Sequence, residues 1–481
     1  MIILYCILGI VLLLILFMVI RTVLTKALPI EKSDYELHGI DKDLVVAHLS
    51  DAVKFKTVTL QNPRAETRVF LEYQTFLEKT YPTLFTLAKK TQINRYSVYY
   101  VVEGSDKSLL PIGILAHQDV VPAPEEGWEV PPFSGIVKDN CVYGRGSQDM
   151  KSQMIAALEG LEILLNDGFQ PKRTIYFCFG HDEELRGTEG ALQISHHLKD
   201  KGVRFEFVLD EGGTILDGKM LGINNKIALI GTCEKGYADF ILESVKTGGH
   251  ASSPSKRTAV GTLAEAIYDI ELCQRRPFFS KPTKEMFKAL APYMKPVFKF
   301  LFVNRDILSP LLKLILTKAH PMTNSLLRTT MAPTQAKGAD APNVLPPKAT
   351  ANINCRINTG ETIEDIKKHI KAIVGKKINV SLDQGHVDPS PVSDIQGAPY
   401  KILSKTISEV FNGYICAPFM FIAATDSKHY YPLTDCVYRF TPFDKTEDDA
   451  ARIHAINERQ NIDSLVAGVE FYIRLYQNAC S

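Results

Sequence analysis

The chain begins with an unbroken apolar run, from Ile2 to Ile20, that contains no charged side chain. A helix of this length would extend about 28 Å, which is close to the ~30 Å hydrocarbon core of a bilayer. No small-residue cleavage motif follows the run, which is also longer than the apolar region of a usual signal peptide. We therefore expect an uncleaved single-pass membrane anchor, with a cleaved signal peptide as the alternative.

Beyond residue 41 the apolar positions follow strand and helix periodicities in turn. Short, nearly continuous apolar runs predict strands at residues 96–103, 111–116, 174–179 and 205–209. Amphipathic patterns predict helices at residues 71–81, 151–166 and 188–201, and residues 41–58 are predicted to form a helix and a turn. Strands that alternate with helices form parallel βαβ units, so this part of the chain is predicted to be an α/β domain.

The pattern changes over residues 233–386. Strands are predicted there at 237–246, 349–356 and 378–382, helices at 258–274 and 362–374, and an aromatic and leucine-rich helical insert at 277–328. This order predicts a smaller α+β unit that interrupts the sheet. The expected organisation is an anchor and linker (1–40), an α/β domain in two parts (41–232 and 387–481) and the inserted unit (233–386).

Composition and charge narrow the class of protein. Of the 481 residues, 45% are hydrophobic and 23% are charged, which is ordinary for a globular enzyme and excludes a disordered or fibrous chain. Lys and Arg number 55 against 54 Asp and Glu, so we expect no nucleic-acid partner. The nine cysteines form no C-x-x-C pair, which argues against a disulfide framework and against a cysteine zinc finger.

Histidine and acidic side chains gather where predicted strands end, which is where open parallel sheets bind ligands. The clusters are His117-Gln118-Asp119, Asp149 after a glycine-rich turn, Glu183-Glu184, Asp210-Glu211 and, far downstream, His454. Each cluster alone is weak evidence, because such pairs commonly lie on a solvated surface. Adjacent carboxylates that follow a buried strand repel each other, however, and a bound cation removes that cost.

The donor types suit a pair of divalent cations about 3.5–4 Å apart. Asp149, on its glycine-rich turn, is the candidate bridge between them. His117 and Asp210 would complete one cation site, and Glu184 and His454 the other. The expected cofactor is two Zn²⁺ per chain, with Co²⁺ and Mn²⁺ as alternatives, because the order of affinities alone does not decide occupancy.

Two further carboxylates are assigned to the chemistry. Asp119 would accept a hydrogen bond from the His117 imidazole and so orient that ligand. Glu183 would act as the general base, taking a proton from the attacking water and passing it to the leaving nitrogen. Two Zn²⁺ among three ligand carboxylates leave a net positive charge, which stabilises a hydroxide and the developing oxyanion.

Seven motifs resemble those of peptidase family M20 and occur in the family's order: AHQDVVPAPEEGWEVPPFSGIVKDNCVYGRGSQDMK, GHDEE, DEGG, GGHASSP, NVLPP, ATDSKHY and RIHAINE. The resemblance spans about residues 41–475 and is closest to the branch of carboxypeptidase S and N-fatty-acyl-amino-acid synthase/hydrolase. It implies a zinc-exopeptidase fold, in which a three-layer α/β catalytic domain carries an inserted ferredoxin-like α+β lid and dimerisation domain. A homodimer is therefore expected.

The same resemblance implies the ligand set given above, and its H-x-x-N-E pattern favours His454 over His429 as a ligand. It also implies a cis peptide bond between Asp149 and Met150. His250 resembles a histidine that reaches the partner subunit's site and polarises the scissile carbonyl. His250 as a plain loop residue is the alternative.

Asn343 and Arg356 resemble residues that hold the substrate's carboxylate. The alternative for Arg356 is a surface ion pair. Where relatives often have T-D-S-R, this chain has Thr425-Asp426-Ser427-Lys428, and lysine cannot make the bidentate contact of arginine.

These assignments predict a di-zinc metallohydrolase that cleaves an amide bond beside a free α-carboxylate. Its substrate would be a short peptide or an N-acyl amino acid, and the apolar insert at 277–328 favours a long acyl chain. The reverse reaction, condensation of a fatty acid with an amino acid, is open to the same site. The alternatives are a catalytically silent binding or scaffold protein of the same fold, and a two-metal phosphoesterase, for which no basic cluster is present.

The side of the membrane on which the body lies is left open by the sequence. Arg21 and Lys26 follow the apolar run and favour a cytoplasmic body, whereas the sequon Asn379-Val380-Ser381 favours the opposite side. We expect a membrane protein with an extracytoplasmic or lumenal body.

Overall fold

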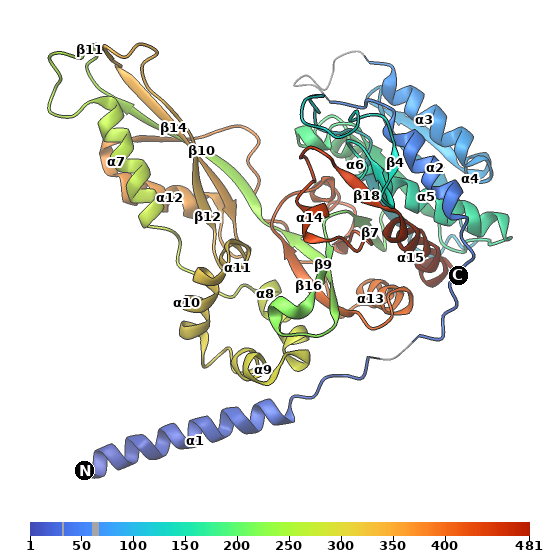
Figure 1. Ribbon diagram of the computed structural model, residues 1–481, viewed down its shortest axis with the longest axis horizontal. Coiled ribbons are helices and arrows are strands. Elements are labelled where there is room, and N and C mark those ends of the chain that lie inside the picture. The colour runs from blue at the N-terminus through green and yellow to red at the C-terminus, as the bar shows by residue number, and fades with distance from the viewer. Residues whose placement is uncertain (31–32, 60–66) are drawn as a thin grey trace.

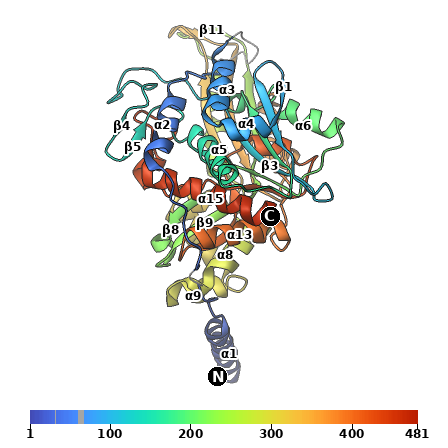
Figure 2. The ribbon, with the colours of Figure 1, turned by 90° about the vertical axis from the view of Figure 1, so that its right-hand side faces the viewer.

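The computed structural model describes residues 1–30, 33–59 and 67–481. The N-terminal apolar run forms helix α1 (Ile2–Leu24), as predicted, which extends away from the body of the molecule (Figures 1 and 2). It is long and apolar enough to cross a membrane, although a signal sequence would pass the same test. Of its residues only Met18 is buried.

A nine-stranded sheet forms the centre of the largest unit, with the order β1-β2-β6-β3-β7-β17-β9-β16 and with β8 paired to β9. Strands β6, β3, β7 and β17 run parallel, as do β9 and β16. Strands β2, β3, β6 and β7 confirm the four strands predicted from apolar runs. The strand bounds are β1 (Lys89–Ile93), β2 (Ser97–Val102), β3 (Ile112–His117), β6 (Ile175–Gly180), β7 (Phe207–Asp210), β8 (Thr214–Asp217), β9 (Lys226–Glu234), β16 (Ile415–Phe421) and β17 (Val437–Arg439).

Helices cover both faces of this sheet (Figure 2). Alternate residues of β6 enter different cores: Phe177 and Phe179 pack with one set of helices, and Cys178 packs on the other face. Helix α6 (Ala191–Asp200) lies on the second face. The first face carries α2 (Lys42–Val53), α3 (Val69–Thr80), α4 (Pro82–Leu87), α5 (Lys151–Asn166), α13 (Ala398–Val410) and α15 (Ile462–Cys480). The predicted layered α/β architecture is thus present.

A second sheet stands apart from the first (Figure 1). It is antiparallel with the order β12-β14-β10-β15, and α7 (Ala259–Leu272) and α12 (Ile363–Val374) pack on it. A small two-stranded sheet, β11 (Gly249–His250) with β13 (Val344–Leu345), lies at its outer end. The bounds are β10 (Gly236–Val245), β12 (Thr330–Lys337), β14 (Lys348–Ile357) and β15 (Asn379–Leu382). Its role as a lid and dimerisation domain stays a prediction.

The helical insert packs on the first sheet rather than on the second. Its side chains share a core with β9 and β16, through residues such as Phe287, Phe302, Ile227 and Phe419. The insert comprises α8 (Lys281–Leu290), α9 (Pro296–Val303), α10 (Ser309–Ala319) and α11 (Pro321–Leu327). Sequence periodicity predicted these helices within the inserted unit, because it reveals their apolar faces and not the surface that covers them.

A third small sheet joins two distant segments. Strand β18 (Arg459–Asn461) pairs with β5 (Cys141–Tyr143), which pairs with β4 (Val137–Lys138). The short helix α14 (Glu447–Ala450) precedes β18. The pairing brings the C-terminal segment beside the glycine-rich turn after β5. Short 3-10 turns complete the chain, at Glu183–Leu185, Gly218–Leu221, Ala291–Tyr293, Gly375–Lys377 and Asp426–His429.

Candidate active site

The polar clusters meet at one edge of the large sheet, as their sequence positions predict. His117 is the last residue of β3, and Glu183 and Glu184 follow β6 in a 3-10 turn. Strands β3, β6 and β7 are parallel neighbours, so their carboxyl ends lie side by side. Asp149 comes from the loop between β5 and α5.

Asp149 lies between two imidazoles. Its Oδ1 is 3.0 Å from Nε2 of His117, and its Oδ2 is 3.0 Å from Nε2 of His454. The peptide bond from Asp149 to Met150 is cis, which confirms that expectation. One carboxylate that faces two imidazole nitrogens has the arrangement required of a bridging ligand.

Three glutamates surround this core. Glu184 Oε1 lies 3.2 Å from Nε2 of His454, and Glu211 Oε1 lies 3.3 Å from Nε2 of His117. Donor atoms of His117, Asp149 and Glu184 lie within 4.8 Å of one another, and so do those of His117, Glu183 and Glu211. The site therefore places four carboxylates around two imidazoles.

The protonation of these groups reflects the excess of carboxylates. Burial raises the pKa of Glu183 well above its usual value, and burial beside the Asp149 carboxylate raises the pKa of Glu211 to about 7. Hydrogen bonds to Asp149 and Glu184 raise the pKa of His454 to about 10. Burial opposes ionisation of Asp149, but its two imidazole partners outweigh burial and lower its pKa. The site thus favours bound positive charge.

Divalent cations fit this donor set. Imidazole nitrogens and carboxylate oxygens, without a thiolate, are ligands for zinc and similar ions. Glu184 Oε1 is a buried atom that approaches His454 Nε2 at 3.2 Å without well-aligned hydrogen-bond geometry, and a cation would satisfy it. Bound cations would also offset the repulsion among the glutamates.

Asp210 is the last residue of β7, and its carboxylate contacts backbone groups. Its Oδ2 accepts a hydrogen bond from the backbone N–H of Ser427 at 2.8 Å, and its Oδ1 accepts one from that of Glu211 at 2.9 Å. These bonds engage both carboxylate oxygens of Asp210, and the next residue, Glu211, faces His117 instead. The sequence showed two adjacent acids at the end of β7, and it did not show that Glu211 is the one that faces His117.

Asp119 lies beside the ring of His117. Its Oδ1 lies 3.4 Å from Nδ1 of His117, whose Nδ1 is also 2.9 Å from the Asp119 carbonyl oxygen. The same carboxylate accepts backbone hydrogen bonds from Glu183 at 3.2 Å and Glu184 at 3.1 Å. Asp119 therefore links the end of β3 to the turn that carries both glutamates.

The geometry also distinguishes His454 from His429 as a candidate metal ligand. His454 has a left-handed backbone, with φ of 62°, and its ring enters the cluster. The His429 ring instead lies 3.0 Å from the carbonyl oxygen of Arg186. Burial, assisted by the Lys428 charge, lowers the pKa of His429 to about 4. Of the two, only His454 meets Asp149 and Glu184.

Two of the predicted substrate residues, His250 and Asn343, lie away from this cluster, beside the outer end of the second sheet. His250 is exposed on β11, where Nδ1 is 2.7 Å from the hydroxyl of Ser252. Asn343 is its neighbour, because the Asn343 carbonyl accepts a hydrogen bond from Ala251. Both lie at the end of the second sheet that is distant from the large sheet (Figure 1). Within one chain, His250 and Asn343 therefore do not reach the cluster around Asp149.

Arg356 lies at the opposite end of the second sheet. It pairs in register with Tyr237, and its guanidinium lies 4.8 Å from the centre of the Tyr237 ring. Arg186, two residues after Glu184, lies 5.8 Å from the same ring. Arg356 is therefore close to the turn that carries the glutamates.

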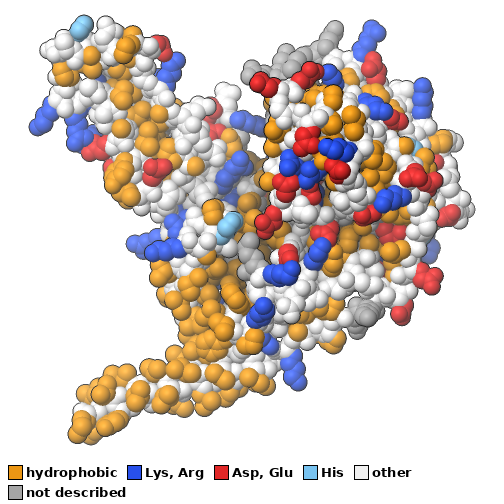
Figure 3. Space-filling model, viewed as in Figure 1, with side chains coloured by type: hydrophobic (Ala, Val, Ile, Leu, Met, Phe, Trp, Pro, Cys, Tyr) orange, Lys and Arg blue, Asp and Glu red, His pale blue; other side chains and the backbone are white. Residues whose placement is uncertain are grey.

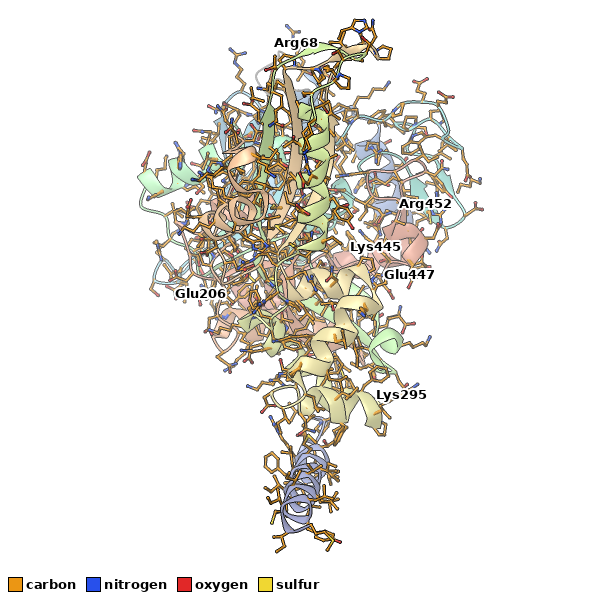
Figure 4. The ribbon with its side chains drawn as sticks, turned by 90° about the vertical axis from the view of Figure 1, so that its left-hand side faces the viewer. Arg68, Glu206, Lys295, Lys445, Glu447 and Arg452 are labelled. Carbon is orange, nitrogen blue, oxygen red and sulfur yellow. The ribbon has the colours of Figure 1, made fainter. Side chains whose placement is uncertain are left out.

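Two residues that sequence reasoning did not assign, the buried Glu458 and the partly buried Lys445, lie around the cluster. Glu458 accepts backbone hydrogen bonds from Gly146 and Gln148, and it pairs with the guanidinium of Arg145. The RIHAINE motif contained Glu458, so its presence in a motif was the available signal. Burial lowers the pKa of Lys445, which lies near Asp149 and beside α14, where Figure 4 labels it. No sequence pattern marked Lys445.

Comparison with known proteins agrees with the motifs. The family described as peptidase family M20/M25/M40 matches residues 113–478. The N-fatty-acyl-amino acid synthase/hydrolase PM20D1 of Xenopus tropicalis is 38% identical over 92% of this chain and 87% of that protein. Carboxypeptidase S of Saccharomyces cerevisiae is 31% identical over 89% and 82%. The crystal structure of the metallo-carboxypeptidase Sso-CP2 from Sulfolobus solfataricus shares the fold, with a TM-score of 0.68 at 17% identity over 90% and 98% of the two chains.

Proposed function

The chain belongs to the peptidase family M20/M25/M40, and we propose that it is a two-metal hydrolase of amide bonds that lie beside a free α-carboxylate. The observation that carries this proposal is the position of Asp149 between His117 and His454, with three glutamates around them. A silent scaffold would not need to retain such a repulsive group of carboxylates.

The residues that would hold two Zn²⁺ are His117 and Glu211 for one cation, Glu184 and His454 for the other, and Asp149 between them. Such ions polarise a scissile carbonyl and lower the pKa of a water molecule. Asp119 keeps the His117 ring in place through its contact with Nδ1.

Glu183 is the proposed general base. It lies with His117 and Glu211 in one group of donor atoms, yet it is not needed to complete either set of ligands. Its carboxylate would take a proton from the attacking water and deliver it to the leaving nitrogen. The raised pKa of Glu183 suits a group that must both accept and return a proton.

The proposed substrates are N-acyl amino acids, long-chain ones in particular, and C-terminal dipeptides. Support comes from the names of the relatives, which include N-fatty-acyl-amino acid synthase/hydrolase and carboxypeptidase S. Arg356 is suited to binding the substrate's carboxylate, since it is near the glutamate turn. His250 and Asn343 would serve the site of the second subunit of a homodimer. The same site would catalyse condensation of a fatty acid with an amino acid.

We also propose that α1 anchors the chain in a membrane, with the body on the extracytoplasmic or lumenal side. Its length and its exposed apolar side chains support this.

The test is hydrolysis by the full chain of N-acyl amino acids of graded acyl length and of C-terminal dipeptides, with and without a chelator. Glu183→Gln should abolish turnover and keep the bound metal, because Glu183 is not a proposed ligand. Glu72→Gln, at an exposed glutamate on α3, is the matched control and should keep full activity. Hydrolysis that survives both the chelator and Glu183→Gln would refute the proposal.

A further inference from the structure

The helical insert carries large apolar side chains on its outer surface as well as on its inner one. We call this surface the outer apolar face, and its members are between 40% and 71% exposed. They are Val297 and Phe298 on α9, Leu311, Leu314 and Ile315 on α10, and Met322 on α11. Figure 3 shows hydrophobic side chains that continue from this region onto α1.

Helix α10 shows the feature most clearly. Leu312 and Leu316 point into the core beneath it, whereas Leu311, Leu314 and Ile315 point outward. A surface helix of a soluble protein normally keeps its outward face polar. Grouped, exposed apolar side chains of this size mark a surface that binds a partner or a membrane.

The outer apolar face adjoins the point where α1 joins the body. The side-chain amide of Asn304, at the end of α9, donates hydrogen bonds to the Met18 carbonyl at 3.2 Å and to the Thr22 hydroxyl at 3.0 Å. Arg21 pairs with Asp306 at 2.8 Å. These contacts hold the last turns of α1 against the insert, so a membrane that encloses α1 would come close to α9 and α10.

The charges around this face suit a membrane surface. Residues 291–320 contain five Lys or Arg and one acidic residue, Asp306, which is already paired with Arg21. Lys295, labelled in Figure 4, lies at the start of α9. Long basic side chains beside an apolar face can lay their stems on it and place their charges among anionic headgroups.

We propose that the outer apolar face of α9–α11 rests in the headgroup and acyl boundary of a phospholipid bilayer, beside the membrane span of α1. This proposal rests on the proposed anchor. A bilayer is the occupant because the face is continuous with a helix of membrane length and is bordered by basic side chains. The catalytic body would then lie against the surface where amphiphilic acyl substrates concentrate.

The experiment uses the full chain in phospholipid nanodiscs that contain phosphatidylserine, with and without lipids brominated on their acyl chains. Bromine quenches tryptophan fluorescence at short range, and the chain has a single tryptophan, Trp128, whose signal is subtracted. Leu314→Trp reports on the outer apolar face. Leu272→Trp, at an exposed leucine of α7 on the second sheet, is the matched control, and Leu12→Trp reports on α1.

The expected result is that the brominated lipids quench the added fluorescence of Leu314→Trp and leave that of Leu272→Trp unchanged. Equal, unquenched emission from these two variants would overturn the proposal. Quenching of Leu12→Trp alone would retain the anchor and refute docking of the face, whereas quenching of Leu314→Trp alone would support docking and refute the anchor. Val297→Trp, on α9, repeats the measurement should Leu314→Trp fold poorly.

Discussion

The Oε1 atom of Glu458 lies 3.3 Å from the backbone nitrogen of Asp149, the residue at the centre of the candidate metal site. Glu458 also pairs with Arg145, whose guanidinium donates a hydrogen bond to the carbonyl oxygen of His454 at 3.1 Å. One buried carboxylate therefore fixes both the loop that carries Asp149 and the loop that carries His454. The two loops are about 300 residues apart in the chain, as the separation of 309 between Asp149 and Glu458 shows.

Glu458→Gln should weaken this support without removing a ligand. An amide group would turn an N–H toward the Arg145 guanidinium, and the two loops would lose their common partner. We expect metal affinity or kcat/KM to fall about 10- to 100-fold, which is usual for residues that position ligands. Glu470→Gln is the control, because Glu470 is another buried glutamate, on α15, that contacts His38, and it should leave metal affinity unchanged.

Glu211→Gln and Asp210→Asn test whether the acid that faces His117, Glu211, or the acid expected from sequence, Asp210, binds the metal. Glu211→Gln should lower the bound metal toward one ion per chain, because an amide is a poorer ligand than a carboxylate. Asp210→Asn should retain both ions, since Asp210 accepts backbone hydrogen bonds instead of facing His117. Elemental analysis of the two purified variants distinguishes them, and the reverse pattern would restore Asp210 as the ligand.

Asp210 and Glu211 also show how much of the candidate site could be predicted from the sequence. The sequence predicted the edge of the sheet at which the site lies, because several apolar strands end in His or acidic residues and parallel strands bring such ends together. The choice between Asp210 and Glu211 depends on Ser427, a residue 217 positions away that binds Asp210 through its backbone. Packing of α8 to α11 on β9 and β16 is equally non-local. The local sequence pattern shows which residues are apolar or charged, whereas contacts with distant segments of the chain determine where each side chain points.

Removal of the metal should destabilise the fold as well as abolish activity. Without cations, Glu183, Glu184 and Glu211 repel one another in a poorly solvated site. A ligand present at 100 times its Kd stabilises a protein by about 2.7 kcal/mol, so a chelator should lower the Tm measurably. Calorimetry with and without chelator, followed by readdition of zinc, checks this, and an unchanged Tm would argue against metal in the folded protein.

Stability should depend on pH through Lys235, a buried residue between β9 and β10. Burial, together with the Arg356 charge and despite the opposing effect of Glu361, lowers its pKa from 10.5 to about 7. Between these values the unfolded chain holds a proton that the folded chain lacks, so this contribution to stability rises with pH, by at most about 1.4 kcal/mol per pH unit. Below pH 7 Lys235 is protonated in both the folded and the unfolded chain, so its destabilising effect on the fold no longer changes with pH.

Lys235→Met removes this titration, so wild type should gain stability relative to the variant as pH rises from about 7 to 10. The loss of the Lys235 hydrogen bond to the Arg328 carbonyl adds a difference that does not vary with pH. Denaturant midpoints at several pH values provide the measurement, and parallel curves for the two proteins would contradict the expectation.

Mixed subunits test the role proposed for His250. If His250 completes the partner's site, His250→Ala and Glu183→Gln chains are each inactive, but their heterodimer has one intact site. Random pairing of equal amounts should restore about a quarter of wild-type activity in a two-fold symmetric dimer. Activity assays after mixed refolding or coexpression check this. Full activity of His250→Ala alone would show that His250 is an ordinary loop residue.

The pairing of β10 with β14 fixes the distance between the two ends of the second sheet. The ladder runs from Gly236 opposite Ile357 to Val245 opposite Lys348, and at about 3.4 Å per residue it is roughly 30 Å long. Arg356 lies near one end of this ladder, beside the glutamate turn, and His250 lies beyond the other end. If the ladder moves as a rigid body, a small rotation near Arg356 displaces the His250 imidazole by a much larger distance. If Arg356 binds the substrate's carboxylate and His250 serves the partner's site, as proposed, one rotation of the second sheet would couple these two events.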